Sequence, residues 1–138
     1  RMGMSHVIPE LIKKILFLEE GEELNVFSVN HTRTFCYIDD AINLFNLIIQ
    51  NKNTTNQILN MGVSGPEIKI LELAKMLCTL SSKNIKINAM GVQEGSISRR
   101  CPDMNKTIKL TKYKPEFDLK TGLSSTYNWY KKNINVYL

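Results

Sequence analysis

The hydrophobic residues near the start of the chain recur every three or four positions. Over residues 5–18 they would share one face of a helix, and they are Val7, Ile8, Leu11, Ile12, Ile15 and Leu16. Ser5 is a suitable N-cap for this helix, and Gly21 is a suitable stop after it. The pattern therefore predicts an amphipathic helix.

Shorter segments have the character of strands. Residues 34–38 are rich in strand-forming side chains, and residues 85–89 alternate between apolar and polar. Residues 24–29 and the apolar run at residues 57–63 are also predicted to be strands. A turn is expected at residues 30–31.

Four further helices are predicted. Asp39 and Asp40 precede a strongly apolar stretch at residues 41–50, and their carboxylates would cap the helix that it forms. The other three helices lie at residues 67–80, 105–111 and 119–133. Helices that alternate with strands indicate an α/β fold, and the length fits one domain, residues 1–138.

The composition narrows the class of protein. Hydrophobic residues make up 43% of the 138 positions, which is enough for a core, and no apolar run is long enough to cross a membrane. The three cysteines, Cys36, Cys78 and Cys101, are odd in number and far apart. This spacing favours reduced thiols over disulfides or a zinc site, so we expect a cytoplasmic protein that binds no membrane.

The net charge of +5 comes mostly from lysines that are scattered along the chain. Scattered lysines favour a solvated basic surface over a nucleic-acid interface. Arginine is rarer, and Arg33, Arg99 and Arg100 lie beside a predicted strand or in the long aperiodic segment at residues 91–103. Because the guanidinium group binds phosphate through a planar fork, these residues predict an anion site.

No catalytic or metal-binding constellation is evident. His6 and His31 lack partners at metal-ligand spacing, and two consecutive aspartates on a helix do not face each other. The glycines of residues 60–65 offer a minor alternative, a phosphate-binding loop ahead of a helix.

Five segments, taken in order, carry a family resemblance. They are Arg1-Met2-Gly3 with His6-Val7-Ile8-Pro9; Thr32-Arg33-Thr34-Phe35-Cys36-Tyr37-Ile38-Asp39-Asp40; Asn60-Met61-Gly62; Arg99-Arg100-Cys101-Pro102-Asp103 with Lys106; and Tyr113-Lys114-Pro115 followed by Gly122-Leu123 and Thr126-Tyr127-Asn128-Trp129-Tyr130. Together they resemble the C-terminal part of the extended short-chain dehydrogenase/reductases, the NAD-dependent nucleotide-sugar epimerases, dehydratases and decarboxylases.

The resemblance implies that this chain and another part of a longer enzyme have different functions. Residues 1–138 would be its nucleotide-sugar-binding domain, in which Arg33 and Arg100 contact the pyrophosphate and Val7 lies near the nucleotide. NAD and the catalytic Tyr/Lys pair would belong to a preceding Rossmann half that is absent here, so we expect no NAD bound to this chain alone. The resemblance also implies that the whole enzyme is a homodimer.

Two other functions stay open at this point. One is a free-standing module that binds a nucleotide sugar without catalysis. The other is a basic domain that binds nucleic acid. Its start at Arg1 favours the enzyme fragment. The sequence departs from the family pattern in the turn Ser28-Val29-Asn30-His31, which lacks the usual glycine, and at Tyr113, where a tryptophan is common.

Overall fold

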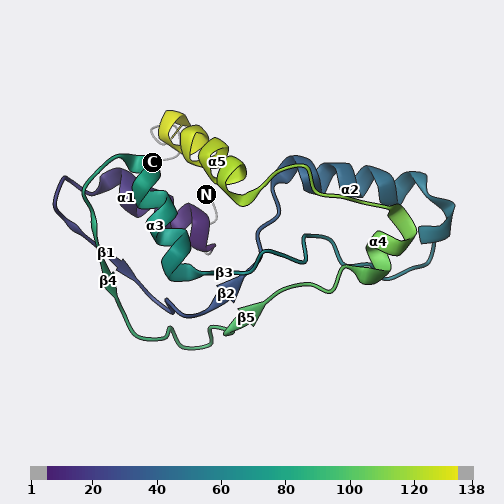
Figure 1. The fold of residues 1–138 in the computed structure, drawn as a ribbon, viewed down its shortest axis with the longest axis horizontal. Helices are drawn as coiled ribbons and strands as arrows, with labels where there is room; N and C mark the ends of the chain where they lie inside the picture. The colour runs from purple at the N-terminus through teal and green to yellow at the C-terminus, as the bar shows by residue number, and fades with distance from the viewer. Residues whose placement is uncertain (1–5, 134–138) are drawn as a thin grey trace.

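The computed structural model describes residues 6–133, so the Arg1-Met2-Gly3 segment lies outside the described residues. The molecule is elongated, and its helices gather in one group at each end (Figure 1). The first group is α1 (Val7–Phe17), α3 (Ile70–Ser81) and α5 (Leu119–Asn133), and the second is α2 (Ile38–Gln50) and α4 (Asn105–Thr111). A single 3-10 turn, η1 (Lys52–Thr54), follows α2.

Two small sheets connect the helices. β1 (Glu23–Val26) pairs in parallel with β4 (Lys86–Ala89), with Leu24 opposite Ile87. In the second sheet, β2 (Thr32–Arg33) lies between β3 (Ile68–Lys69), which is antiparallel to it, and β5 (Arg99–Arg100), which is parallel. This second sheet lies between the two groups of helices in Figure 1.

The main core fills the space between α1, α3, α5 and β1. Leu11, Ile12 and Ile15 on the inner face of α1 are at most 3% exposed, as the helical spacing predicts. The C-terminus of α1 is closed by Lys83, whose ammonium group donates to the carbonyl oxygens of Ile15, Leu16 and Leu18. A cation at this position satisfies carbonyl groups that have no partner within the helix.

The predicted strand at residues 34–38 is wrong. Residues 34–37 form no strand, β2 ends at Arg33, and α2 begins at Ile38. Tyr37, one of the aromatic residues that suggested a strand, packs instead against the C-terminal part of the chain. The Tyr37 ring lies 4.8 Å from that of Phe117, and a Cβ atom on Gly122 would come within 3.1 Å of Tyr37.

Asp40 does not cap α2, contrary to the prediction. No side chain caps this helix, and Asp40 is buried, with 1% of its surface exposed. Its carboxylate accepts hydrogen bonds from the backbone N–H groups of Glu116 (2.8 Å) and Phe117 (3.2 Å). Asp40 therefore fixes the segment that leads into α5, while exposed Asp39 stays near the N-terminus of α2.

The strand predicted at residues 57–63 is also absent. The segment is extended but has no strand partner among the described residues. Side chains at α4 hold its carbonyl groups instead: Lys106 donates to Ile58 (3.1 Å), and Thr107 donates to Asn60 (2.8 Å).

The remaining predicted elements occur near their expected positions. Helices α4 and α5 have the predicted bounds, while α3 starts three residues late because Ile68–Lys69 pairs with β2 as a strand. Within residues 6–133, no helix has the length and apolar character that crossing a membrane requires.

Candidate functional site

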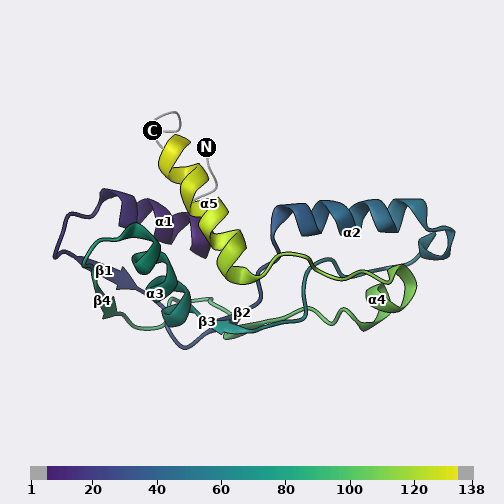
Figure 2. The same cartoon turned by 45° about the horizontal axis from the view of Figure 1, so that its top comes forward.

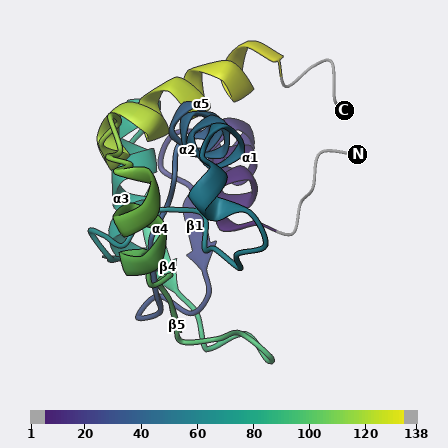
Figure 3. The ribbon, with the colours of Figure 1, turned by 90° about the vertical axis from the view of Figure 1, so that its right-hand side faces the viewer.

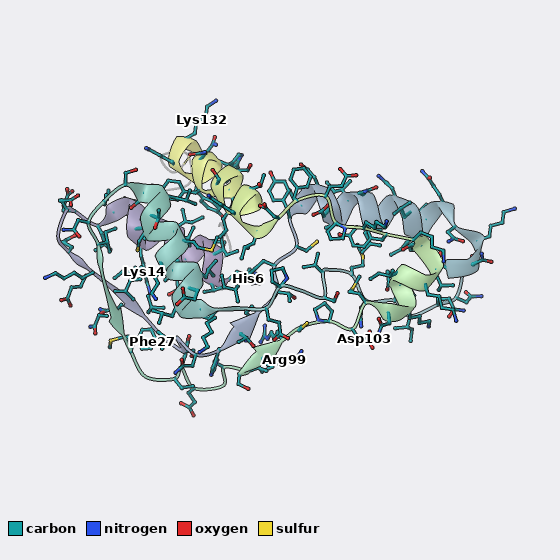
Figure 4. All side chains as sticks on the ribbon, in the orientation of Figure 1. His6, Lys14, Phe27, Arg99, Asp103 and Lys132 are labelled. Atoms are coloured by element: carbon teal, nitrogen blue, oxygen red, sulfur yellow. The ribbon has the colours of Figure 1, made fainter. Side chains whose placement is uncertain are left out.

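A cavity of about 580 Å³ lies beside the first turns of α1, where β1 and β2 end. Its wall comes from six parts of the chain: residues 6–11 and 14, residues 25–28, residues 33–35, residues 93–96, and the single positions Ile70 and Arg100. Figure 4 shows where His6 and Phe27, which belong to this wall, lie relative to Arg99. The three residues predicted to bind substrate, Val7, Arg33 and Arg100, all line this cavity.

Arg33 and Arg100 are direct neighbours across the second sheet. They are register partners in the parallel pair of β2 and β5, although 66 residues separate them in sequence. Partners in register on adjacent strands project from the same face of a sheet, and both residues border the same cavity. The expected convergence of the two arginines is therefore confirmed.

The two guanidinium groups lie close enough for the charge of one to act on the other. Burial and the positive charge of Arg100 both lower the pKa of Arg33. Among the salt bridges within residues 6–133, none involves either arginine. Two cations held side by side repel each other, and an anion placed between them would convert that repulsion into attraction. The arrangement therefore favours an anionic ligand.

Arg33 is oriented by backbone carbonyl groups. Its Nη1 donates to Thr32 O at 2.7 Å, and its Nη2 donates to Ile97 O at 2.6 Å. A guanidinium group has five N–H donors, so three remain for a ligand. These two bonds hold the fork in place before any ligand arrives, which lowers the entropic cost of binding.

Arg99 projects away from this pair and has its own partner. Its Nε donates to Glu67 Oε2 at 2.9 Å, and its Nη2 donates to Glu67 Oε1 at 2.6 Å. The pairing lowers the pKa of Glu67 and raises the pKa of Arg99. Successive residues on a strand face opposite sides, which explains why Arg99 and Arg100 differ. Of the three arginines that predicted an anion site, Arg99 alone does not line the cavity.

A segment between β4 and β5, residues 91–98, forms one side of the cavity. Figure 3 shows it extending away from the helices. It is fastened by His31 Nδ1, 3.0 Å from Ser96 Oγ, and by Ser28 Oγ, which accepts from the Gln93 N–H at 3.1 Å. His31 and Ser96 are 65 residues apart, and no spacing pattern in the sequence links them.

The turn that lacks the family's glycine is accommodated by Ser28. This residue adopts a left-handed backbone conformation, with φ at +52°. Glycine reaches that conformation without strain, whereas a serine is strained there. The hydroxyl group of Ser28 accepts the hydrogen bond from the Gln93 N–H, which glycine could not do. Arg33 in β2 lines the cavity beyond this turn.

The described residues offer no cradle for a dinucleotide or a metal. The segment at residues 60–65 leads into β3 and not into a helix N-terminus, so the phosphate-loop alternative is wrong. Within residues 6–133, no group of three His, Cys, Asp or Glu side chains could hold a metal ion.

The chain is similar to known proteins over nearly its whole length. The family described as "NAD dependent epimerase/dehydratase family" matches residues 1–62. UDP-glucuronate 4-epimerase of Thermodesulfobacterium geofontis is 27% identical over 91% of this chain and 39% of its own length. UDP-glucuronic acid decarboxylase 1 of Xenopus tropicalis is 28% identical over 96% of this chain and 30% of its own length.

A solved structure agrees with these sequence matches. UDP-glucuronic acid 4-epimerase from Bacillus cereus, in complex with UDP-glucuronic acid and NAD, superposes with a TM-score of 0.80 and 28% identity. The match covers 95% of this chain and 41% of the Bacillus cereus chain. The chain thus spans well under half the length of the relatives it matches, and it corresponds to their C-terminal portion.

Proposed function

Because the chain belongs to the extended short-chain dehydrogenase/reductases of the NAD-dependent epimerase/dehydratase family, we propose that it is the substrate-binding part of a nucleotide-sugar-modifying enzyme. The whole enzyme would be an epimerase, a dehydratase or a decarboxylase, that is, an isomerase or a lyase. It would use NAD held by the rest of the protein and act as a homodimer.

The observation that carries the proposal is the pair formed by Arg33 and Arg100. Both line one cavity, face one another across adjacent strands and lack a salt-bridge partner among the described residues. A pyrophosphate carries the charge and the oxygen atoms that two planar forks can bind. The cavity volume of about 580 Å³ is within the range of small-molecule sites.

The rest of the wall suits a nucleoside. Val7 on α1 and Phe35 after β2 present apolar surface, and Phe27 after β1 keeps 44% of its surface exposed beside the cavity. An exposed aromatic ring offers a stacking surface for a base. We therefore assign the nucleoside to the side of the cavity formed by α1 and β1, and the pyrophosphate to the arginine pair. Binding there would position the sugar for chemistry performed elsewhere.

Calorimetric titration of the chain tests this assignment. We expect UDP or GDP to bind more tightly than the corresponding monophosphate, because only a diphosphate reaches both arginines. NAD should not bind to this chain alone. Equal affinity for UDP and UMP, and for GDP and GMP, would refute the pyrophosphate site.

A further inference from the structure

A buried histidine holds the segment at residues 91–98 close to the arginine pair. His31 is 8% exposed and directly precedes β2, the strand that carries Arg33 and lies between the two groups of helices in Figure 2. A polar side chain is rarely buried without a hydrogen-bond partner, and Nδ1 of His31 lies 3.0 Å from Oγ of Ser96. The anion site described above uses neither of these two side chains.

The segment at residues 91–98 is held by hydrogen bonds and not by apolar packing. Its two large apolar side chains, Val92 and Ile97, are 70% and 54% exposed. A turn within the segment is closed by the Ser96 N–H, which donates to the Gln93 carbonyl group at 3.0 Å. Because the segment buries so little apolar surface, each of its hydrogen bonds contributes a large share of what fixes its position.

The bond between His31 and Ser96 lies one residue away from a carbonyl group that orients Arg33. That carbonyl group belongs to Ile97, and it accepts from Nη2 of Arg33 at 2.6 Å. On the other side of Ile97, the Ser98 carbonyl group accepts from the backbone of β2 at 2.8 Å. Loss of the His31 anchor would leave only this second anchor, and backbone rotation at Ser96 and Ile97 could then turn the carbonyl group away from the guanidinium group.

We propose that His31 is a positioning residue, which acts through Ser96 and Ile97 to hold the guanidinium group of Arg33 in the orientation that binds a diphosphate. The inference rests on the proposed function. His31 does not line the cavity, so it acts without touching the ligand. A guanidinium group that is already oriented loses little rotamer freedom on binding, whereas a free one loses it at that step, which lowers affinity by about two- to tenfold.

The second sheet does not depend on this contact, which allows a mild variant to test it. Backbone hydrogen bonds join β2 to β3 and to β5, and the Glu67 carboxylate accepts from Thr32 at 3.1 Å and from Arg99. Ser96→Ala removes the side-chain contact while these strands stay paired. Ser98→Ala is the matched control, because Ser98 is exposed and its side chain forms no hydrogen bond with another described residue.

Nitrogen-15 NMR of the arginine side chains tests the proposal in the chain without ligand. A guanidinium group held at both Nη atoms, like that of Arg33, rotates slowly and gives resolved Nη–H signals, whereas a free one gives averaged signals. Ser96→Ala should average the Arg33 signals, and Ser98→Ala should not. The signals of Arg99, which pairs with Glu67, are the internal reference and should not change. Resolved Arg33 signals in Ser96→Ala would overturn the proposal.

Calorimetry measures the effect on binding. Ser96→Ala should weaken UDP binding about two- to tenfold, and Ser98→Ala should leave it unchanged. His31→Leu should reproduce the loss, whereas His31→Asn, which keeps a polar atom near the position of Nδ1, should restore most of the affinity. In an Arg33→Lys background, Ser96→Ala should have no further effect, because positioning acts only through that arginine. A further loss of the same size in that background would overturn the proposal and show a general loosening of the cavity wall.

The two measurements separate this proposal from the proposed function. A chain that binds UDP no better than UMP, but in which Ser96→Ala averages the Arg33 signals, would refute the pyrophosphate site and support the role of His31 in holding Arg33. A chain that prefers UDP, but whose Arg33 signals do not respond to Ser96→Ala, would support the pyrophosphate site and refute the positioning role.

Discussion

Replacement of Arg100 by lysine is the sharpest test of the arginine pair. Arg100 lies in register with Arg33 and lines the cavity, and no hydrogen bond or salt bridge between described residues involves its side chain. The substitution therefore removes no bond that holds the fold together. Lysine keeps the positive charge but loses the planar fork that matches phosphate oxygens.

The size of the effect follows from the contact that is lost. A charge-assisted hydrogen bond to phosphate contributes roughly 1.5–3 kcal/mol. Arg100→Lys should therefore weaken UDP binding by about ten- to a hundredfold. Arg33→Lys should weaken it at least as much, because that change also removes the bond to the Ile97 carbonyl group that orients the fork.

Arg99→Lys is the matched control. Its side chain pairs with Glu67 on the opposite side of the strand, and both groups are exposed. Exposed ion pairs stabilise a fold only weakly, so this variant should keep both its melting temperature and its UDP affinity. Calorimetry at low and at physiological salt, with thermal melting as the check on folding, measures all three variants. Equal losses of affinity for Arg99→Lys and Arg100→Lys would show a general basic patch and would refute the paired site.

Three further predictions concern the fold that supports the site. Asp40→Asn should lower the free energy of unfolding by about 2–4 kcal/mol, because the amide presents N–H groups to one of the two backbone donors that the buried carboxylate accepts from. The exposed control Asp39→Asn should change the free energy of unfolding little. Equal losses for the two variants in chemical denaturation would contradict the role assigned to Asp40. Lys83→Met should lower the melting temperature by removing the cation at the C-terminus of α1, corresponding to about 1–2 kcal/mol, whereas Lys86→Met on an exposed strand position should not. Burial raises the pKa of Tyr113, so the stability that the neutral phenol contributes is complete below the unfolded phenol pKa of about 10 and is lost as pH rises toward the folded pKa. In Tyr113→Phe, the midpoint of alkaline unfolding, followed by circular dichroism, should therefore shift to higher pH. An unchanged midpoint would rule out this linkage.

Several features of this protein are set by residues that are close together in the sequence. The first helix was predictable because its apolar spacing is a local signal, although it begins after His6 and ends at Phe17, within the predicted bounds. The bounds of the last two helices also agree with the prediction. The α/β class follows from the same patterns. Arg33 and Arg100 could also be identified, because arginine is scarce here and the segments around both residues resemble those of one family. Their roles as phosphate ligands stay predictions that the titrations above will test.

Other features were decided only by contacts between distant segments. The strand propensity of residues 34–38 was overridden when Tyr37 packed against Phe117, and Asp40 was drawn from a helix cap to backbone groups far along the chain. The register of Arg33 with Arg100 depends on a two-residue strand inside a segment without periodicity. The His31–Ser96 bond beside the cavity has no local signal either. Local patterns encode elements because they record which face of one helix or strand is buried, whereas a binding site depends on which elements meet, and that is fixed only when the tertiary structure forms.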